Sequence, residues 1–549
     1  MRKLLTLCAA LLLAATSVKA QWKPSYTDFT VLGTDSVYGQ GGLKTLRTPE
    51  GNIVLTWVNH PKDISYKDAN YGYYLYMQIF DPQGNALFGK DGKTIVGKHT
   101  FSWYGDYGLT LSSDGNILIG YTDARNNESK SASNNFFYCY KQDGTSVWSE
   151  DGVQFESVAE HPGARDMEPS VMASDGNIYA SIMHTESYNV KADSTNWQPS
   201  EWFPDEEMPD SVLMSSSNYQ VMRLNADGSK AWDAPIILDR DYLWMYPAPD
   251  GNAYLVYPNN GYGVDVRCID KDGKDVWSEP VNAISEQIGT SSYTEKPAIE
   301  SDGKGGLIFA YRALINYSGY LALQHLYADG TVWSESLNAN GTMDGNATNP
   351  EIAVKGEKTF VAWSYENVAG SKDLMVNQID NECDYTLEGD SLLGYALDNN
   401  EMWGLTAVKV IPRTDGWVVL YGNSQSWNGA NFYACKIGDD GKVAWKKQIA
   451  EDDFKASGFS VVYDDQNAYI FYTCDVEYDD NWEEIPGEGG MRMFCIDLNG
   501  GTDNIANIKT NENQNTMIYN AQGMQVTNTN APGMYIIKQN GTTKKVVKK

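Results

Sequence analysis

The chain has 549 residues, of which 42% are hydrophobic and 12% aromatic, so it has ample material for a folded core. It carries 42 Lys and Arg against 72 Asp and Glu, a formal net charge of -30. This charge argues against nucleic acid and anionic membrane surfaces as partners, because both reward clustered Lys and Arg.

Residues 1–20 have the pattern of a secretory signal peptide. Arg2 and Lys3 precede an apolar run, and Val18-Lys19-Ala20 forms a small-residue cleavage signature. The apolar run of about a dozen residues is shorter than the roughly 20 that a membrane span needs. We therefore expect cleavage before Gln21 and export of a chain without a transmembrane segment.

One unit recurs along residues 38–500: a strand, an Asp-Gly type turn, a second strand, a variable loop, a third strand, another such turn, and an aromatic residue. The first turn recurs about every 59 residues, at Gly51, Gly115, Gly176, Gly251, Gly303, Gly356, Gly416 and Gln466. The second turn contains Gly84, Gly144, Gly228, Gly273, Gly330, Gly441 and Gly500, with a degenerate copy near Asp380. Asp-Gly between alternating runs predicts hairpins, and four strands at this period predict propeller blades. Residues 21–501 are thus predicted to be an all-β, eight-bladed β-propeller of four-stranded blades.

An aromatic side chain follows the second turn in six units, at Phe88, Trp148, Trp232, Trp277, Trp333 and Trp445. Its repetition favours packing between neighbouring blades, contributing about 2 to 3 kcal/mol per copy, over a ligand-binding stripe. The last unit lacks this aromatic, whereas Trp22 and a strand-like segment follow the predicted cleavage site. We expect residues 22–32 to supply the outer strand of the last blade, which leaves no unpaired edge.

The positions of the cysteines and histidines give little indication of disulfide bonds or metal sites. Four cysteines occupy an equivalent third-strand position and are predicted to be small buried hydrophobes, namely Cys139, Cys268, Cys435 and Cys495. Asp270–Asp275 has the spaced carboxylates of a calcium loop, but its place in the repeat is that of a hairpin turn. His60 and His184 have no clustered partners in the sequence. We predict no cofactor and no metal site, with calcium as the open alternative.

Four long loops follow second strands and are expected to border one face of the ring. Aromatic residues of these loops, together with Trp103 and Tyr104 outside them, suit stacking on sugar rings and are the predicted ligand-binding residues: Trp103, Tyr104, Trp197, Trp202, Phe203, Tyr478 and Trp482. Their acids would be the catalytic carboxylates if the protein were a hydrolase: Asp205, Glu206, Asp479 and Glu483. The alternative is that these loops are solvated and have no ligand, and that their aromatic side chains pack against the rim of the propeller.

Residues 502–549 differ in composition and end in a basic run. The segments Met517–Val526, Pro532–Ile537 and Lys544–Lys548 resemble the type A C-terminal sorting domain of the Bacteroidota type IX secretion system. The resemblance implies a small β-sandwich-like domain, contact with outer-membrane secretion machinery and a secreted or cell-surface destination. The repeats, Pro297–Trp333 most clearly, resemble those of exported Bacteroidota propeller-like proteins and imply no established chemistry.

The sequence therefore predicts a secreted or surface binding protein that recognises a glycan or a protein through its long loops. Two alternatives stay open, a carbohydrate-active enzyme that uses loop carboxylates and a non-catalytic scaffold. The turns place Gly directly after Asp and so do not fit the Ser-x-Asp-x-Gly-x-Thr-Trp boxes of sialidases. The prediction is a binding protein rather than an enzyme.

Overall fold

The computed structural model separates the chain into two compact units, Met1–Gly500 and Gly501–Lys549. In the first unit it describes residues 22–27, 30–32, 41–59, 72–97, 107–125, 133–161, 164–198, 207–259, 263–289, 295–315, 318–339, 346–366, 370, 372–381, 395–400, 404–424, 430–454, 456–474 and 490–499. In the second unit it describes residues 517–520, 525–526, 533–539 and 542–548. The predicted signal peptide lies outside these ranges.

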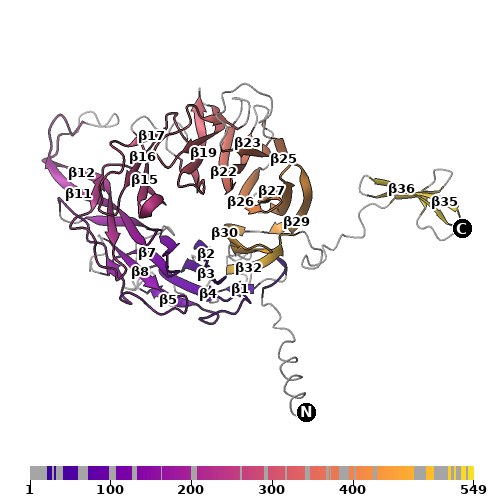
Figure 1. The fold of residues 1–549 in the computed structure, drawn as a ribbon, viewed down its shortest axis with the longest axis horizontal. Coiled ribbons are helices and arrows are strands. Elements are labelled where there is room, and N and C mark those ends of the chain that lie inside the picture. Colours follow the sequence, from indigo (N-terminus) through magenta and orange to yellow (C-terminus); the bar gives the residue numbers. More distant parts are fainter. Residues whose placement is uncertain are drawn as a thin grey trace, which may run out of the picture. The chain divides into compact units, whose positions relative to one another are not determined.

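The first unit is a ring of antiparallel sheets around a common centre, which is the architecture of a β-propeller (Figure 1). Neighbouring sheets touch through their first strands, which therefore lie innermost. The ring closes where β2 (Gly41–Arg47) meets β30 (Ala456–Tyr463), with Thr45 Oγ1 2.7 Å from Ser460 Oγ.

The first four sheets contain β2 to β5, β6 to β9, β10 to β13 and β14 to β17 in chain order. Their remaining strands are β3 (Ile53–Asn59), β4 (Tyr74–Phe80), β5 (Lys93–Val96), β6 (Gly108–Leu111), β7 (Ile117–Asp123), β8 (Asn134–Tyr140), β9 (Val153–Gln154), β10 (Arg165–Ser174), β11 (Asn177–Lys191), β12 (Ser211–Leu224), β13 (Ile236–Leu238), β14 (Trp244–Pro247), β15 (Ala253–Pro258), β16 (Val264–Ile269) and β17 (Val281–Ile284). The 3-10 turn η1 (Pro249–Gly251) joins β14 to β15.

The next sheet has eight strands, because the set from β18 to β21 joins the set from β22 to β25 through one parallel pair, Gly319 with Asn346. It is followed by the sheet of β26 to β29 and by a sheet in the order β1-β32-β31-β30. These strands are β18 (Ala298–Ser301), β19 (Leu307–Ile315), β20 (Ser318–Leu326), β21 (Leu337–Asn338), β22 (Asn346–Lys355), β23 (Lys358–Glu366), β24 (Lys372–Asp380), β25 (Tyr395–Asn400), β26 (Leu405–Arg413), β27 (Gly416–Ser424), β28 (Ala430–Gly438), β29 (Val443–Phe454), β31 (Asn467–Cys474), β32 (Gly490–Asp497) and β1 (Thr30–Leu32).

The second strand of a sheet is enclosed on both faces by the neighbouring sheets. All 7 residues of β3 (IVLTWVN) and all 7 of β7 (ILIGYTD) are buried, which explains their nearly continuous apolar sequence. Apart from the Gly319–Asn346 pair, the described first strands instead have a free edge toward the centre. Proline therefore occurs in them without breaking a ladder, as Pro169 in β10 and Pro350 in β22 do beside bulges.

The repeated aromatic residues pack between sheets, which confirms the structural interpretation of that repeat. Each of four rings lies against the second-turn glycine of the following sheet, in the pairs Phe88–Gly144, Trp148–Gly228, Trp232–Gly273 and Trp277–Gly330. A Cβ at Gly228 would lie 2.9 Å from the Trp148 ring. Gly228 also has a φ of 85°, so both the turn and the ring require glycine there.

Two of these indoles donate to the same carbonyl position of the next turn, Trp148 to Ala226 at 2.8 Å and Trp232 to Lys271 at 2.8 Å. At the closing sheet the donor is Trp22, whose indole N–H lies 3.1 Å from the equivalent carbonyl of Pro82. Since β1 pairs with β32 at Thr30–Met493, the N-terminal segment supplies both the outer strand and the aromatic. This pairing agrees with the closing strand predicted for residues 22–32.

Cys139, Cys268 and Cys435 are free thiols and are buried, as predicted. Cys495 is only half-buried, whereas Cys383 lies outside the described residues. The proposed calcium loop is a hairpin turn, in which Asp270 Oδ1 accepts the backbone N–H groups of Asp272 and Lys274 at 2.9 Å each.

The second unit contains one antiparallel sheet in the order β34-β33-β35-β36. Its strands are β33 (Met517–Asn520), β34 (Gln525–Val526), β35 (Gly533–Gln539) and β36 (Thr542–Lys548). Within the described part of both units, no helix has the length and apolar character to cross a membrane.

Candidate functional site

Of the predicted site residues, only Trp197 lies in a described part of the chain. The other aromatics, Trp103, Tyr104, Trp202, Phe203, Tyr478 and Trp482, lie outside the described residues. So do the candidate carboxylates Asp205, Glu206, Asp479 and Glu483. The site is therefore built from Trp197 and the strands that carry it.

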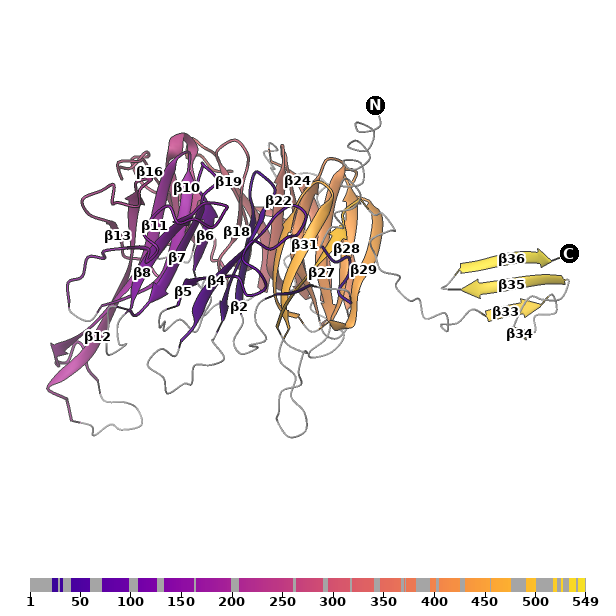
Figure 2. The ribbon, with the colours of Figure 1, turned by 90° about the horizontal axis from the view of Figure 1, so that it is seen from below.

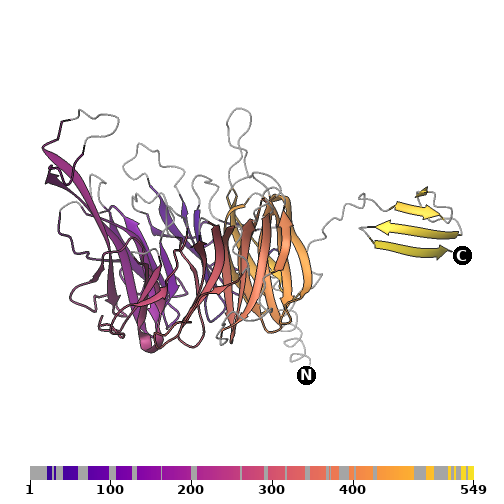
Figure 3. The ribbon, with the colours of Figure 1, turned by 90° about the horizontal axis from the view of Figure 1, so that it is seen from above.

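Trp197 follows a two-stranded ribbon formed by the outer halves of β11 and β12. β11 has 15 residues, about 50 Å at 3.3 Å per residue, and pairs with β12 from Ile178–Leu224 to Lys191–Ser211. The two strands extend past the ends of the neighbouring sheets (Figures 2 and 3). The ribbon thus presents its far end away from the ring.

The two faces of the ribbon differ in character. Cross-strand pairs Tyr188–Met214 and Val190–Val212 share one face, and all four side chains are half-buried. The opposite face carries the exposed pairs Ser187–Ser215 and Asn189–Leu213, with Leu213 66% exposed. Since strand residues alternate between faces, the apolar and polar positions of this sequence fix the register of the ribbon.

A compact turn holds Trp197 beyond the end of the ribbon. Its backbone N–H donates to the carbonyl of Asp193 at 3.0 Å. Asp193 Oδ1 in turn accepts the N–H of Thr195 at 2.8 Å and its hydroxyl at 2.6 Å, and Asn196 Nδ2 donates to the Lys191 carbonyl at 2.9 Å. Trp197 is half-buried, so part of its surface stays open to solvent.

The base of the ribbon is fixed by a buried histidine between two carboxylates. His184 Nδ1 lies 2.6 Å from Asp166 Oδ1, and its Nε2 lies 3.0 Å from Glu186 Oε1. The three residues are 0%, 1% and 4% exposed. Glu186 also accepts the N–H groups of Glu160 at 2.6 Å and His161 at 3.0 Å, which ties the segment before β10 to β11.

The charges of this cluster support each other. Burial alone would lower the pKa of His184, but the hydrogen bonds to Asp166 and Glu186 outweigh it and raise that pKa. Burial alone would raise the pKa of Glu186, whereas its bonds from His184, Glu160 and His161 lower it. Because both ring nitrogens face carboxylates, we assign the doubly protonated imidazolium.

A second cluster of ionisable side chains lies around the centre of the ring. It comprises Tyr246 (β14), Glu300 (β18), Glu351 (β22), Lys409 (β26) and Tyr463 (β30), each from a different innermost strand. Lys409 Nζ lies 4.0 Å from Glu351 Oε2. Burial is the main cause of the raised pKa of Tyr246, Tyr463 and Glu351, and the charge of Glu300 adds to each of these shifts. We call these five residues the central cluster.

The central cluster contains a carboxyl that titrates near neutrality. Burial raises the pKa of Glu351 to about 7, Lys409 opposes the shift and Glu300 adds to it. Glu300 is exposed to solvent, but neighbouring residues crowd its carboxyl group. The resulting partial desolvation also raises the pKa of Glu300. A carboxyl of this kind beside a second carboxyl is what general acid–base chemistry uses.

The sequence analysis did not select Glu300 or Glu351. Both lie in first strands, which the repeat pattern assigns to the structural framework of the blades. The available signal was an acid inside an apolar strand soon after a proline, Pro297 and Pro350 respectively. A bulge between Thr348 and Glu351, which re-aims the side chains that follow, could not be foreseen.

Among the described residues, no group of three or more His, Cys, Asp or Glu side chains is placed to hold a metal ion. His184 has two carboxylate partners, but hydrogen bonds occupy both of its ring nitrogens.

No protein family model and no curated protein matches the chain. Solved structures similar to it include the Hadza microbial sialidase Hz136 (12% identity, TM-score 0.32, 78% of this chain and 74% of that one). Others are a protein of unknown function from Dyadobacter fermentans (13%, 0.34, 85% and 96%) and the β-propeller domain of the Trilobed protease from Pyrococcus furiosus (11%, 0.33, 75% and 99%). Function is therefore inferred from the residues of this chain.

Proposed function

We propose that the protein is a secreted or cell-surface β-propeller that binds a glycan through the end of the β11–β12 ribbon. The observation that carries the proposal is Trp197, a half-buried aromatic residue whose backbone is held by a hydrogen-bonded turn at the end of strands that extend past the neighbouring sheets. A partly exposed indole can stack on a sugar ring, and the hydrogen-bonded turn lowers the entropic cost of ordering the segment that carries it. Trp202, Phe203, Trp103, Tyr104, Tyr478 and Trp482 remain candidate further contacts.

A glycan array tests this function. The purified protein is expected to give specific signals that Trp197→Ala reduces at least tenfold, because the substitution removes the stacking surface. Trp197→Phe is expected to retain part of the binding. Tyr242→Ala, which removes a 41% exposed aromatic elsewhere on the ring, is the control and should bind normally. Absence of signal from the wild-type protein would contradict glycan binding and favour a protein ligand or a scaffold role.

A second candidate function, glycoside hydrolysis, is favoured by the central cluster. Glu351, with its pKa near 7, would act as general acid, and Glu300 as its carboxylate partner. We expect a hydrolase to lose at least a thousandfold in turnover with Glu351→Gln, measured by release of reducing sugar from array-positive glycans. Equal turnover in the wild type and Glu351→Gln would show that the central cluster takes no part in catalysis.

We further propose that the ring has eight blades, since each predicted repeat falls on one set of four strands and β1 completes the last set.

Residues 1–20 would direct export. Residues 502–549 would act as a type IX sorting domain, a role supported by their separate compact unit. Mass spectrometry of the secreted protein, expected to begin at Gln21, tests the first of these roles.

A further inference from the structure

One junction between sheets differs from the others in its aromatic side chain. Phe88 stands between the β2–β5 and β6–β9 sheets, where neighbouring junctions have tryptophan, and its ring packs on Gly144. Phenylalanine has no N–H, so it gives no bond to the carbonyl of Gln142, the position equivalent to Ala226. The hydrogen bond that Trp148 makes with Ala226 at the next junction has no counterpart from Phe88.

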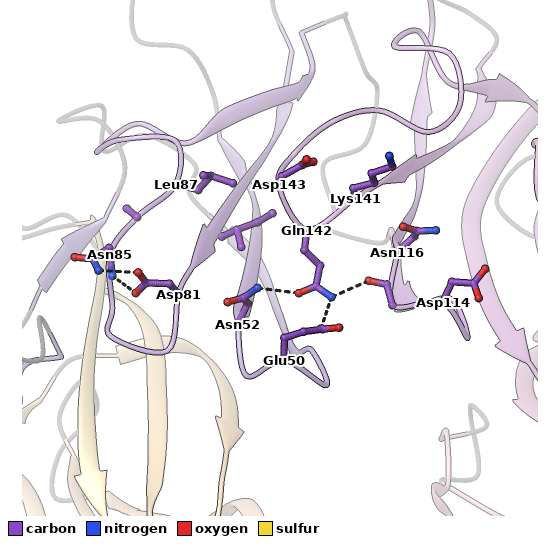
Figure 4. A pocket seen from close by; sticks show the side chains of 13 residues that line it. Glu50, Asn52, Asp81, Asn85, Leu87, Asp114, Asn116, Lys141, Gln142 and Asp143 are labelled. Atoms are coloured by element: carbon purple, nitrogen blue, oxygen red, sulfur yellow. Dashed lines mark hydrogen bonds between the residues drawn. The ribbon is translucent and has the colours of Figure 1, made fainter.

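A groove of about 790 Å³ opens at this junction, on the side of the Asp-Gly turns (Figure 4). The opposite ends of the strands face the ribbon side, so the groove and Trp197 lie at different faces of the ring. The volume falls within the range of small-molecule sites, about 300 to 1,000 Å³.

Gln142 stands in the groove and connects both walls (Figure 4). Its Oε1 accepts a hydrogen bond from Asn52 Nδ2 at 2.8 Å, and its Nε2 donates to the Glu50 carboxylate and to the Gly115 carbonyl, the latter at 3.3 Å. Glu50 and Asn52 belong to one sheet and Gly115 to the next. The side chain therefore holds the groove at a set width before any ligand arrives.

The walls combine fixed acceptors and donors with an apolar strip. Asp81 is oriented by the N–H of Asn85 at 2.8 Å and by its Nδ2 at 2.7 Å, and Asp143 by the N–H of Thr145 at 2.9 Å. Asp114, Asn116 and Lys141 add further polar groups to the lining, while Ile79, Ala86 and Leu87 supply the apolar part. Leu87 is 48% exposed.

We propose that this groove is a second ligand site, for a neutral, hydroxyl-rich ligand such as one or two residues of a saccharide. Hydroxyl groups both donate and accept, and so match a lining of carboxylates, amides and one lysine. The C–H face of the ligand covers Leu87, and preoriented side chains lower the entropic cost of binding. This site does not depend on Trp197.

The test uses an array of neutral gluco-, manno-, galacto- and xylo-oligosaccharides with the full protein. In the Trp197→Ala protein, a set of signals is expected to remain. Adding Gln142→Ala or Asp143→Ala is expected to reduce these signals at least tenfold. Asp227→Ala is the matched control, because Asp227 accepts the N–H of Ser229 at 3.0 Å in the equivalent turn, at a junction closed by Trp148.

Asp143→Ala and Asp227→Ala should lower the Tm by similar amounts, since each removes the same turn bond, but only Asp143→Ala should weaken binding. Three results would overturn the proposal: no binding signal in the Trp197→Ala protein, remaining signals that Gln142→Ala does not reduce, or remaining signals that Asp227→Ala reduces as much as Asp143→Ala does. If Trp197→Ala leaves all binding signals unchanged and Gln142→Ala reduces them, the ribbon site is refuted and the groove site is supported.

Discussion

The contacts of single residues explain why the same residue types recur at the same positions of the repeat. A second-turn glycine such as Gly228 serves two purposes, a positive φ in the hairpin and room for the aromatic ring of the preceding sheet. Other residues depart from the repeat where they have a special task. His184 is one of these, since its buried contacts with Asp166 and Glu186 anchor the ribbon.

Replacing His184 by Leu is expected to cost about 3 to 5 kcal/mol of unfolding free energy, because it leaves two buried carboxylates without their partner. Urea denaturation at several pH values measures this. The raised pKa of His184 means that its stabilisation is complete below about pH 6.5 and is lost as pH rises through the folded-state pKa. The lowered pKa of Glu186 means that its stabilisation is present above about pH 4.5 and is lost as pH falls through the folded-state pKa.

The stability difference between the wild type and His184→Leu should therefore be largest between about pH 4.5 and 6.5. His161→Leu is the control, because the His161 ring stacks on Tyr188 outside the cluster. A difference that does not change from pH 5.5 to pH 9 would show that His184 is not charged in the folded protein.

At the scale of elements, β1 is three residues long and still completes a sheet of distant strands. It pairs with β32, and the Lys23 carbonyl accepts the N–H of Cys495 at 2.8 Å. Trp22 packs against Tyr469 with ring centroids 4.9 Å apart and against Phe80 at 5.5 Å. The N-terminal segment thus bonds the last sheet to the first.

Trp22→Ala is expected to lower the unfolding free energy by about 3 kcal/mol, through lost packing and the lost bond to Pro82. Trp22→Phe keeps most of the packing and should cost about 1 kcal/mol. Chemical denaturation followed by circular dichroism gives both values, with Trp197→Ala as a control of unchanged stability. A Trp22→Ala protein as stable as the wild type would mean that this segment does not secure the ring.

At the scale of the whole molecule, much of the ring is predictable because its parts are local and repeated. The turn glycines, the packed aromatics such as Trp148 and the closing role of Trp22 all follow from spacing along the chain. The candidate site is less predictable because it depends on contacts between distant segments. Glu351 acquires its raised pKa from burial, with Glu300 on another strand adding to the shift and Lys409 opposing it, and the groove at Gln142 is lined by turns of two different sheets.

The central claim is that the end of the β11–β12 ribbon contacts the ligand. Hydrogen–deuterium exchange of the protein, with and without the strongest saccharide from the array, tests it most directly. Slower exchange is predicted in residues 187–198 and 207–216, with no change in β18 and β22. Protection of β18 and β22 with an unchanged ribbon would contradict this account and place the ligand at the central cluster.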